Sequence, residues 1–397
     1  MIIENQTIEI LAKSALDKKP ISGLTHNFYR YPARFSPSFA STAIQLFSKH
    51  GDLILDPYVG GGTTVIEAMV AGRRVIGADL NSLAVFVTRV KTTPLTKREK
   101  KDVILWNETY PTQFSYQDAS EKLDKVLCEG DKIKNLTLPK ARFIKKIIAT
   151  GLVSLNSIES QKVKNFLRCA ILKTGQRALD GRRTHTSLTE FREKLSQNVY
   201  QMLEELRDFQ RLIYRQKPGK PRRKLIESDA SQIDKLPIFL RENLKADLVI
   251  TSPPYPGIHI LYHRWQVDGR RETPAPYWIA GCQDGQGDSY YNFGSRQQPE
   301  LRSYFDTSLR TLKAIRNVIR DGGYIVQMMA FKNPVDHLQR YLDNMKKAGF
   351  TEVVFSSGGI AERNNRIWRR VPNRKWHASL QGNTASSKEV VLVHKAN

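Results

Sequence analysis

Residues 52–81 of the chain read DLILDPYVGGGTTVIEAMVAGRRVIGADLN. The apolar run at 53–55 is typical of a buried strand, and three consecutive glycines after it predict a tight turn. A helix follows, which we expect Thr63 or Thr64 to cap, and a second apolar run then ends at Asp79. The stretch therefore predicts a β-α-β unit of a parallel sheet, with a ligand-binding turn between its first strand and its helix.

The glycine turn and Asp79 predict a nucleoside site. Glycines allow the backbone to approach a ligand closely, and an acidic residue about 20 positions further on can accept hydrogen bonds from ribose hydroxyls. The turn does not have the G-x-G-x-x-G spacing, because Val65 stands where the third glycine would be. A dinucleotide with a pyrophosphate is therefore disfavoured.

A second informative stretch, at residues 246–257, reads ADLVITSPPYPG. Its first half predicts a buried strand, and its prolines make a stiff platform at the carboxyl end of that strand. An exocyclic amine of a nucleobase is a poor nucleophile, so acceptors aimed at its N–H bonds would help it to react. The Ser252 hydroxyl and the Pro253 carbonyl are candidates, and the Tyr255 ring is suited to stacking on a flipped base.

Composition limits the class of protein. The 397 residues carry a formal net charge of +24, which favours a polyanionic partner, most commonly nucleic acid. No apolar run reaches the roughly 18 residues of a membrane span, and the N-terminal residues lack the apolar core of a signal peptide. We therefore expect a cytoplasmic protein without a membrane partner. Cys128, Cys169 and Cys282 are isolated, and none follows a proline, so neither a metal site nor a cysteine nucleophile is predicted.

Two segments fall outside these strands. Residues 96–225 have helical spacing and contain 29 lysines and arginines against 15 acidic residues, which predicts a basic helical insertion. Residues 258–300 lack periodicity and are rich in aromatic and amide side chains, which suit base stacking and base-edge reading. The candidate DNA-binding residues in and beside these segments are Arg182, Arg183, Arg222, Arg223, Arg264, Gln266, Gln283 and Arg296.

Taken together, D-P-x-x-G-x-G-T-T, T-S-P-P-Y and the Y-P-A-R-F segment at 31–35 resemble the motifs of S-adenosylmethionine-dependent DNA amino-methyltransferases. The resemblance implies an α/β fold with a doubly wound, mostly parallel, Rossmann-like sheet. It would be built from residues 1–95 and 226–397, with 96–225 inserted. It also implies S-adenosylmethionine as the cofactor, held by Pro32, Arg34, Phe35, Asp56, Pro57, Gly60, Gly62, Thr63, Thr64, Asp79, Asp229 and Ala230. By the same resemblance the catalytic residues are Ser252, Pro253, Pro254 and Tyr255.

The predicted function is direct methyl transfer to N4 of cytosine in double-stranded DNA, since serine in the first position of the S-P-P-Y motif favours cytosine. N6 of adenine is the alternative base, and an amine-methylating RNA enzyme is a further one. A basic DNA-binding regulator with a relic fold is the alternative from another class. A cognate restriction or defence partner is expected, and the sequence leaves the oligomeric state open.

Overall fold

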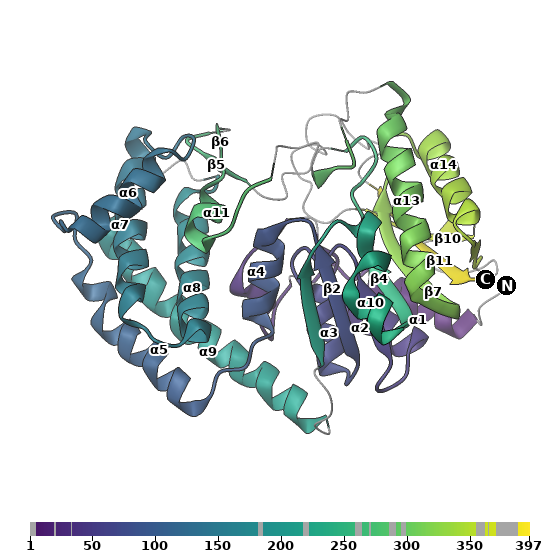
Figure 1. The fold of residues 1–397 in the computed structure, drawn as a ribbon, viewed down its shortest axis with the longest axis horizontal. Helices are drawn as coiled ribbons and strands as arrows, with labels where there is room; N and C mark the ends of the chain where they lie inside the picture. The colour runs from purple at the N-terminus through teal and green to yellow at the C-terminus, as the bar shows by residue number, and fades with distance from the viewer. Residues whose placement is uncertain are drawn as a thin grey trace.

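The computed structural model describes residues 5–19, 21–32, 34–181, 186–216, 222–258, 264–269, 271–285, 291–294, 299–354, 362–363, 365–370 and 388–397. Two parts are visible, a sheet flanked by helices and a helical part beside it (Figure 1). Among the described helices, none combines the length and the apolarity that crossing a membrane requires.

The sheet has the strand order β3-β2-β1-β4-β7-β11-β10-β9, with β8 paired to β11 beside this path. Five strands are parallel: β1 (Leu53–Asp56), β2 (Arg74–Asp79), β3 (Arg223–Glu227), β4 (Ala246–Thr251) and β7 (Ile319–Ala330). The antiparallel part comprises β8 (Phe350–Glu352), β9 (Glu362–Arg363), β10 (Arg366–Arg370) and β11 (Lys388–Ala396). The chain runs outward from β1 to β3 and then returns to place β4 on the other side of β1. This is the topological switch point at which open α/β sheets bind ligands. The prediction of a doubly wound, mostly parallel α/β fold is confirmed.

Helices cover both faces of the sheet because its central strands are apolar on both sides. In β1, Ile54 packs into one core while Leu53 and Leu55 pack into the other. The first core contains α1 (Asn5–Ala15), α2 (Pro37–Phe47), α3 (Thr63–Val70) and α4 (Ser82–Lys91). The second contains α10 (Pro237–Glu242), α13 (Arg302–Val318) and α14 (Pro334–Lys347).

The β-α-β unit forms where it was predicted, but the start of its helix differs. Gly62 is the N-cap of α3, with φ of +80°, and no side chain caps this end. The expectation that Thr63 or Thr64 caps α3 was therefore wrong. The left-handed turn at Gly62 places both threonines inside the first helical turn, where their own amides point toward the loop and the ligand side.

The chain between α4 and β3 forms the helical part. Its helices are α5 (Lys97–Thr109), α6 (Glu121–Asp131), α7 (Pro139–Ser154), α8 (Gln161–Leu179) and α9 (Leu188–Arg215). It shares one continuous apolar core with the first face of the sheet, and the rings of Phe28 and Phe166 meet edge to face at 5.8 Å. The helix α9 runs from the helical part back to the sheet (Figure 1). The burial of the apolar side chains of the helical part is therefore tied to that of the sheet.

Within the segment 258–300, the described residues 264–269 and 271–285 contain regular elements. Strands β5 (Trp265–Val267) and β6 (Arg271–Thr273) form a hairpin, and α11 (Ala275–Ala280) follows and packs on α8. A short hairpin and a six-residue helix leave too few repeats for a periodic pattern to be visible. The lack of periodicity therefore did not reveal these elements.

Candidate active site

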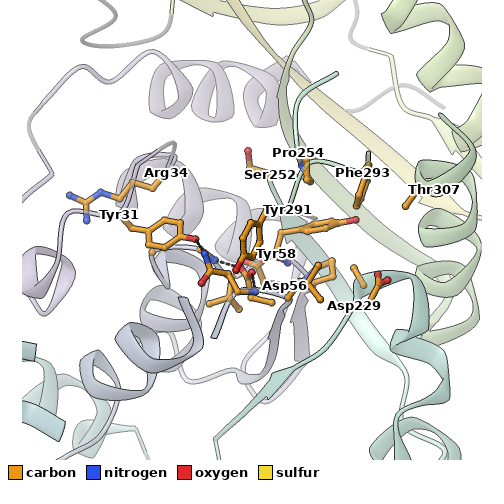
Figure 2. Close-up of a pocket in the computed structure, with 18 of the residues that line it drawn as sticks. Tyr31, Arg34, Asp56, Tyr58, Asp229, Ser252, Pro254, Tyr291, Phe293 and Thr307 are labelled. Atoms are coloured by element: carbon orange, nitrogen blue, oxygen red, sulfur yellow. Dashed lines mark hydrogen bonds between the residues drawn. The ribbon is translucent and has the colours of Figure 1, made fainter. Parts of the chain in front are cut away.

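A single cavity of about 320 Å³ lies at the carboxyl ends of β1, β2 and β4. It brings together residues from the glycine turn, the Y-P-A-R-F segment, the end of β3 and the S-P-P-Y platform. Figure 2 shows Tyr31 and Arg34 on one side, Tyr58 and Tyr291 near the centre, and Phe293 and Thr307 on the other side. A cavity of this size at a topological switch point is typical of a small-molecule site.

Most of the predicted site residues line this cavity. They are Arg34, Phe35, Asp56, Pro57, Gly60, Thr63, Asp79, Asp229, Ala230, Ser252 and Pro254. Five others lie beside it without lining it: Pro32, Gly62, Thr64, Pro253 and Tyr255. The cavity also includes residues from two elements that sequence reasoning did not connect to the donor, namely Asn81 at the start of α4 and Thr307 and Arg310 on α13.

The glycine turn is held by side chains from α4. A Cβ on Gly62 would lie 2.6 Å from Oγ1 of Thr88, so both the positive φ and the close packing require glycine there. Lys91 donates from Nζ to the carbonyl of Gly61 at 2.8 Å, and its side chain is fully buried. Burial keeps the pKa of Lys91 well below its usual range. The loop that faces the ligand therefore has a fixed backbone conformation.

Two buried carboxyl groups follow the first two strands. Asp79 accepts from the amides of Gly60 and Asn81, each at 2.8 Å, and burial raises its pKa to about 7. Asp56 accepts from the amide of Tyr58 at 3.1 Å and from the hydroxyl of Thr251 at 2.9 Å, and burial raises its pKa to about 6. Asp79 thus ties the glycine turn to the end of β2 and presents its carboxylate to the cavity.

The Y-P-A-R-F segment is anchored on buried polar groups. The Arg34 stem packs on Gly61, while Nη1 donates to the carbonyl of His26 at 2.7 Å. Figure 2 shows the Arg34 guanidinium directed away from the other labelled residues. His26 Nε2 and Glu67 Oε1 are 2.8 Å apart, and burial lowers the pKa of His26. In this conformation Arg34 supports the wall of the site through its stem.

The S-P-P-Y platform is tied to the last strand of the sheet. The Ser252 hydroxyl lies 3.0 Å from the carbonyl of Met328 and 3.1 Å from Oη of Tyr255. Tyr255 Oη donates in turn to Oε1 of Glu389 at 2.9 Å, and its ring is only 6% exposed. The other oxygen of Glu389 is 2.7 Å from Nε of the buried Arg369. Both possible acceptors for the Ser252 proton are protein atoms, so its oxygen lone pairs remain available to accept from a ligand.

Pro254 of the platform is also fixed by a hydrogen bond. The hydroxyl of Tyr304 on α13 donates to the carbonyl of Pro254 at 2.7 Å. Phe293 stands against the ring of Tyr304, with centroids 5.5 Å apart, and against Tyr58 at 5.8 Å. The platform therefore has an aromatic wall made by residues 58, 293 and 304.

A hydrogen-bonded chain joins the cavity to α11. Asn81 donates from Nδ2 to Oη of Tyr31 at 3.0 Å and accepts at Oδ1 from the hydroxyl of Tyr277, also at 3.0 Å. Tyr277 Oη is 3.2 Å from Oη of Tyr291, which lines the cavity and is 3.3 Å from Asp284. The segment around α11 is thereby attached to the wall of the cavity.

Sequence reasoning missed Asn81, Lys91, Tyr277, Tyr291 and Glu389. Asn81 directly follows the conspicuous Asp79-Leu80 pair, and Lys91 is a lysine at the end of an otherwise apolar helix, so both carried a weak local signal. Tyr277, Tyr291 and Glu389 act through partners more than a hundred positions away or through a loop, and nothing in the nearby sequence identifies them.

The proposed DNA-binding residues have mixed placements. Arg222 donates to the carbonyls of Ile213 and Gln216, and Arg223 donates to Thr92 and Thr93 at the end of α4. Arg264 faces Glu272 and Asp284, at 3.8 and 3.3 Å. These three guanidinium groups are engaged within the chain, and their contact with DNA stays a prediction.

The remaining candidates divide into two groups. Gln266 lies in β5, and its backbone pairs with Asp180 and Gly181. Gln283 lines a polar groove beside the main cavity. Arg182, Arg183 and Arg296 lie outside the described residues.

The residues present fit S-adenosylmethionine. Oγ1 of Thr63 is buried on the cavity wall without a hydrogen-bond partner among the described residues, which is costly unless a ligand supplies one. Asp79 and Asp229 offer carboxylates for ribose hydroxyls and for an amine, and Asp229 uses only Oδ1 to accept from the amide of Ser231. The glycine turn leaves its backbone close to the ligand space.

The fold and the site together define a Rossmann-like methyltransferase. A family model described as DNA methylase, N6_N4_Mtase, matches residues 9–87, which contain the Y-P-A-R-F segment, the glycine turn and Asp79. This match over part of the chain, together with the similarity to two type II methyltransferases, supports the DNA amino-methyltransferase family, and the residues of the cavity fit S-adenosylmethionine as the cofactor.

Three curated proteins are similar to parts of the chain. Type II methyltransferase M.MvaI of Kocuria varians is 26% identical over 58% of this chain and 53% of its own length. Type II methyltransferase M.MjaII of Methanocaldococcus jannaschii is 26% identical over 34% and 26% of the two lengths. A tRNA (guanine(10)-N2)-dimethyltransferase of Methanothermobacter thermautotrophicus is 45% identical over 15% and 18%. The chain thus matches about half the length of the first relative and less of the others.

Proposed function

We propose that the protein methylates the exocyclic N4 amine of cytosine in double-stranded DNA, with the base flipped into the cavity. The observation that carries this proposal is the place of Ser252, which lines the same cavity as Asp79 and Asp56 and follows the strand next to β1. The description of the matching family model, DNA methylase, supports a DNA substrate.

The protein contributes to this reaction mainly by positioning the reacting groups. When bound, S-adenosylmethionine supplies an electrophilic methyl group. The protein needs to supply acceptors that draw the amine nitrogen toward a tetrahedral state and a pocket that excludes water. Ser252 Oγ accepts one N–H of the amine, because its own proton is donated within the protein. The Pro253 carbonyl accepts the other N–H. No covalent intermediate with the protein is required.

The aromatic wall supplies a stacking surface for the base. Phe293 lines the cavity next to Pro254, whereas Tyr255 is buried beneath the platform and supports it through Glu389. Stacking on Tyr255 itself would require its ring to become more exposed than the 6% seen here. Aromatic stacking is tolerant of base identity, so the platform does not by itself select cytosine.

The first experiment is mass spectrometry of nucleosides from duplex DNA incubated with the protein and S-adenosylmethionine. We expect N4-methylcytosine. If only N6-methyladenine appears, the base assignment is wrong and the amine mechanism stands. A protein that binds the donor but modifies no nucleic acid would support a DNA-binding regulator with a relic fold.

An RNA substrate is the second candidate, favoured by the similarity of part of the chain to a tRNA (guanine(10)-N2)-dimethyltransferase, whose name also specifies an exocyclic amine. The same assay on transfer and ribosomal RNA tests it. Modification of RNA with none of duplex DNA would overturn the DNA assignment. A cognate restriction or defence partner remains a prediction.

A further inference from the structure

A second hollow, a polar groove of about 530 Å³, lies between α4 and β3 of the sheet part and α8 and α11 of the helical part. It adjoins the main cavity, because Asn81 lines the cavity and the next residue, Ser82, lines the groove. Ser82 also donates to the carbonyl of Gln283 at 2.7 Å, so the groove wall is continuous with the segment that carries Tyr291. We call this hollow the interlobe groove.

Arginines and amides dominate its polar lining. Arg89 is an exposed residue in the last turn of α4, and Arg168 lies on α8 across the groove. Gln161 and Asn165 occupy the same side as Arg168, with Gln161 Nε2 donating to Oδ1 of Asn165 at 2.8 Å. Glu227 is the acidic residue of the lining, which leaves an excess of one positive charge.

The place of Arg168 is built into the fold. A Cβ on Gly281 would lie 2.1 Å from Nη1 of Arg168, and Gly281 has φ of +66°, so the guanidinium is packed on a backbone position suited to glycine. The Nε atom of Arg168 is buried without an acceptor among the described residues. A buried donor of a charged group is costly to leave unpaired, and an anion in the groove would supply the acceptor.

We propose that the interlobe groove binds a backbone phosphate of the substrate DNA, with Arg168 and Arg89 as the charged contacts and the amides of Gln161 and Asn165 as neutral ones. This inference rests on the proposed function. Arginine forks match phosphate oxygens, and asparagine and glutamine are frequent phosphate contacts in protein–DNA interfaces. A phosphate held there would lie beside the cavity that receives the flipped base, and would fix the register of the strand.

The test is duplex binding over a salt series, with Arg89→Gln, Arg168→Gln and the double variant. Each neutralised phosphate contributes roughly 0.9 to the slope of log K against log salt. Because one phosphate is proposed, the double variant should lower the slope by about 0.9 and weaken binding at low salt by about tenfold or more, for cognate and random duplexes alike. Affinity for S-adenosylmethionine should not change. Arg241→Gln, an exposed arginine on α10 against the opposite face of the sheet, is the matched control.

Two further variants separate binding from folding. Arg168→Lys keeps the charge and should restore part of the lost affinity. Gly281→Ala keeps the arginine but displaces its guanidinium, and should weaken duplex binding while leaving the donor affinity unchanged. If Arg168→Gln only lowers the melting temperature and leaves the slope unchanged, the role is structural and the inference is wrong.

The proposed function and this inference fail in different ways. Should the wild-type protein bind and methylate duplex DNA while the double variant keeps its affinity and its slope, the groove is no phosphate site and the function stands. A slope change seen only with RNA would overturn the assignment of the groove to DNA. A wild-type protein that binds no nucleic acid would overturn both.

Discussion

Tyr255 donates a hydrogen bond to Glu389 across 134 residues of sequence, with Oη and Oε1 2.9 Å apart. Tyr255 belongs to the S-P-P-Y platform and Glu389 to β11, so this platform is fixed by the antiparallel part of the sheet. Arg369 on β10 completes the arrangement by pairing with the second oxygen of Glu389 and donating to the carbonyl of Ala15 on α1.

The first prediction concerns this pair. Tyr255→Phe keeps the ring and leaves a buried oxygen of Glu389 without its donor, so we expect a loss of about 1–3 kcal/mol in the free energy of unfolding. Turnover should fall because Ser252 loses a neighbour that orients it, while calorimetry should show unchanged affinity for S-adenosylmethionine. Tyr110→Phe, which removes an exposed hydroxyl bond on the helical part, is the control. If Tyr255→Phe weakens donor binding as much as turnover, the two functions are not separate.

A second prediction isolates the buried ion pair. Glu389→Gln removes the charge facing Arg369 and should cost about 3–5 kcal/mol, because it leaves a buried guanidinium unpaired. Combined with Tyr255→Phe, the loss should be smaller than the sum of the two single losses, since both variants break the same network. Strictly additive losses, measured by chemical denaturation, would show that the two contacts are independent.

The third prediction is a pH dependence of donor binding. Burial raises the pKa of Asp79 to about 7, so its carboxylate is ionised at pH 8 and protonated at pH 6. An ionised Asp79 is the better acceptor for ribose hydroxyls. The Kd for S-adenosylmethionine should therefore rise as the pH falls below 7, approaching a tenfold increase per pH unit. Asp79→Asn should bind weakly at every pH and lose the dependence that the wild type shows. A wild-type Kd that is constant between pH 5.5 and 8 would contradict the assignment.

The same shift has a consequence for the donor-free protein. A folded pKa above the unfolded value of 3.8 means that the folded state holds the proton more tightly. The contribution of Asp79 to stability is therefore fully present below pH 3.8, falls as the pH rises, and is lost above about 7. Saturating S-adenosylmethionine should reduce this loss, which thermal unfolding with and without the donor can measure.

A fourth prediction separates donor binding from catalysis. Asp79→Ala should weaken donor binding by about 1.5–3 kcal/mol, roughly tenfold to 150-fold in Kd, because the ribose hydroxyls lose a charged acceptor. Ser252→Ala should leave the donor Kd nearly unchanged and reduce turnover. Ser157→Ala, an exposed serine of the helical part, is the control for the loss of a hydroxyl. Equal losses of donor affinity in the aspartate and serine variants would contradict this division of the cavity.

The fifth prediction tests the glycine turn. Gly62→Ala introduces both an unfavourable backbone angle and a Cβ only 2.6 Å from Oγ1 of Thr88. Gly51→Ala has a similar φ of +87° but open space around its Cβ, so it measures the backbone cost alone, about 1 kcal/mol. We expect Gly62→Ala to lose clearly more than this control in the free energy of unfolding, and to lose donor binding as well. Equal losses in the free energy of unfolding of the two variants would show that the Thr88 side chain moves to accommodate the added Cβ.

The sequence predicted those elements that are determined by short local patterns. The β-α-β unit, the platform at the end of β4 and the helices of the insertion each form within a short window, where apolar spacing and glycine or proline are informative. Asp79, Asp229 and Ser252 lie in one cavity because the carboxyl ends of parallel strands meet at one edge of the sheet. Contacts between distant segments were not predictable in this way. Glu389 reads as an ordinary charged residue in a strand, and Arg223 as part of a basic run, until the sheet places their partners.

The position of β11 between β7 and β10 has a consequence for synthesis of the protein. Of the described elements β11 is made last, yet it lies inside the sheet and pairs with β7 along seven residues. On the ribosome the glycine turn and the lining of the cavity are made before β11, while Tyr255 cannot donate to Glu389 until β11 docks. A nascent chain would therefore acquire donor binding before methyl transfer, and the enzyme would stay inactive until its sheet is closed.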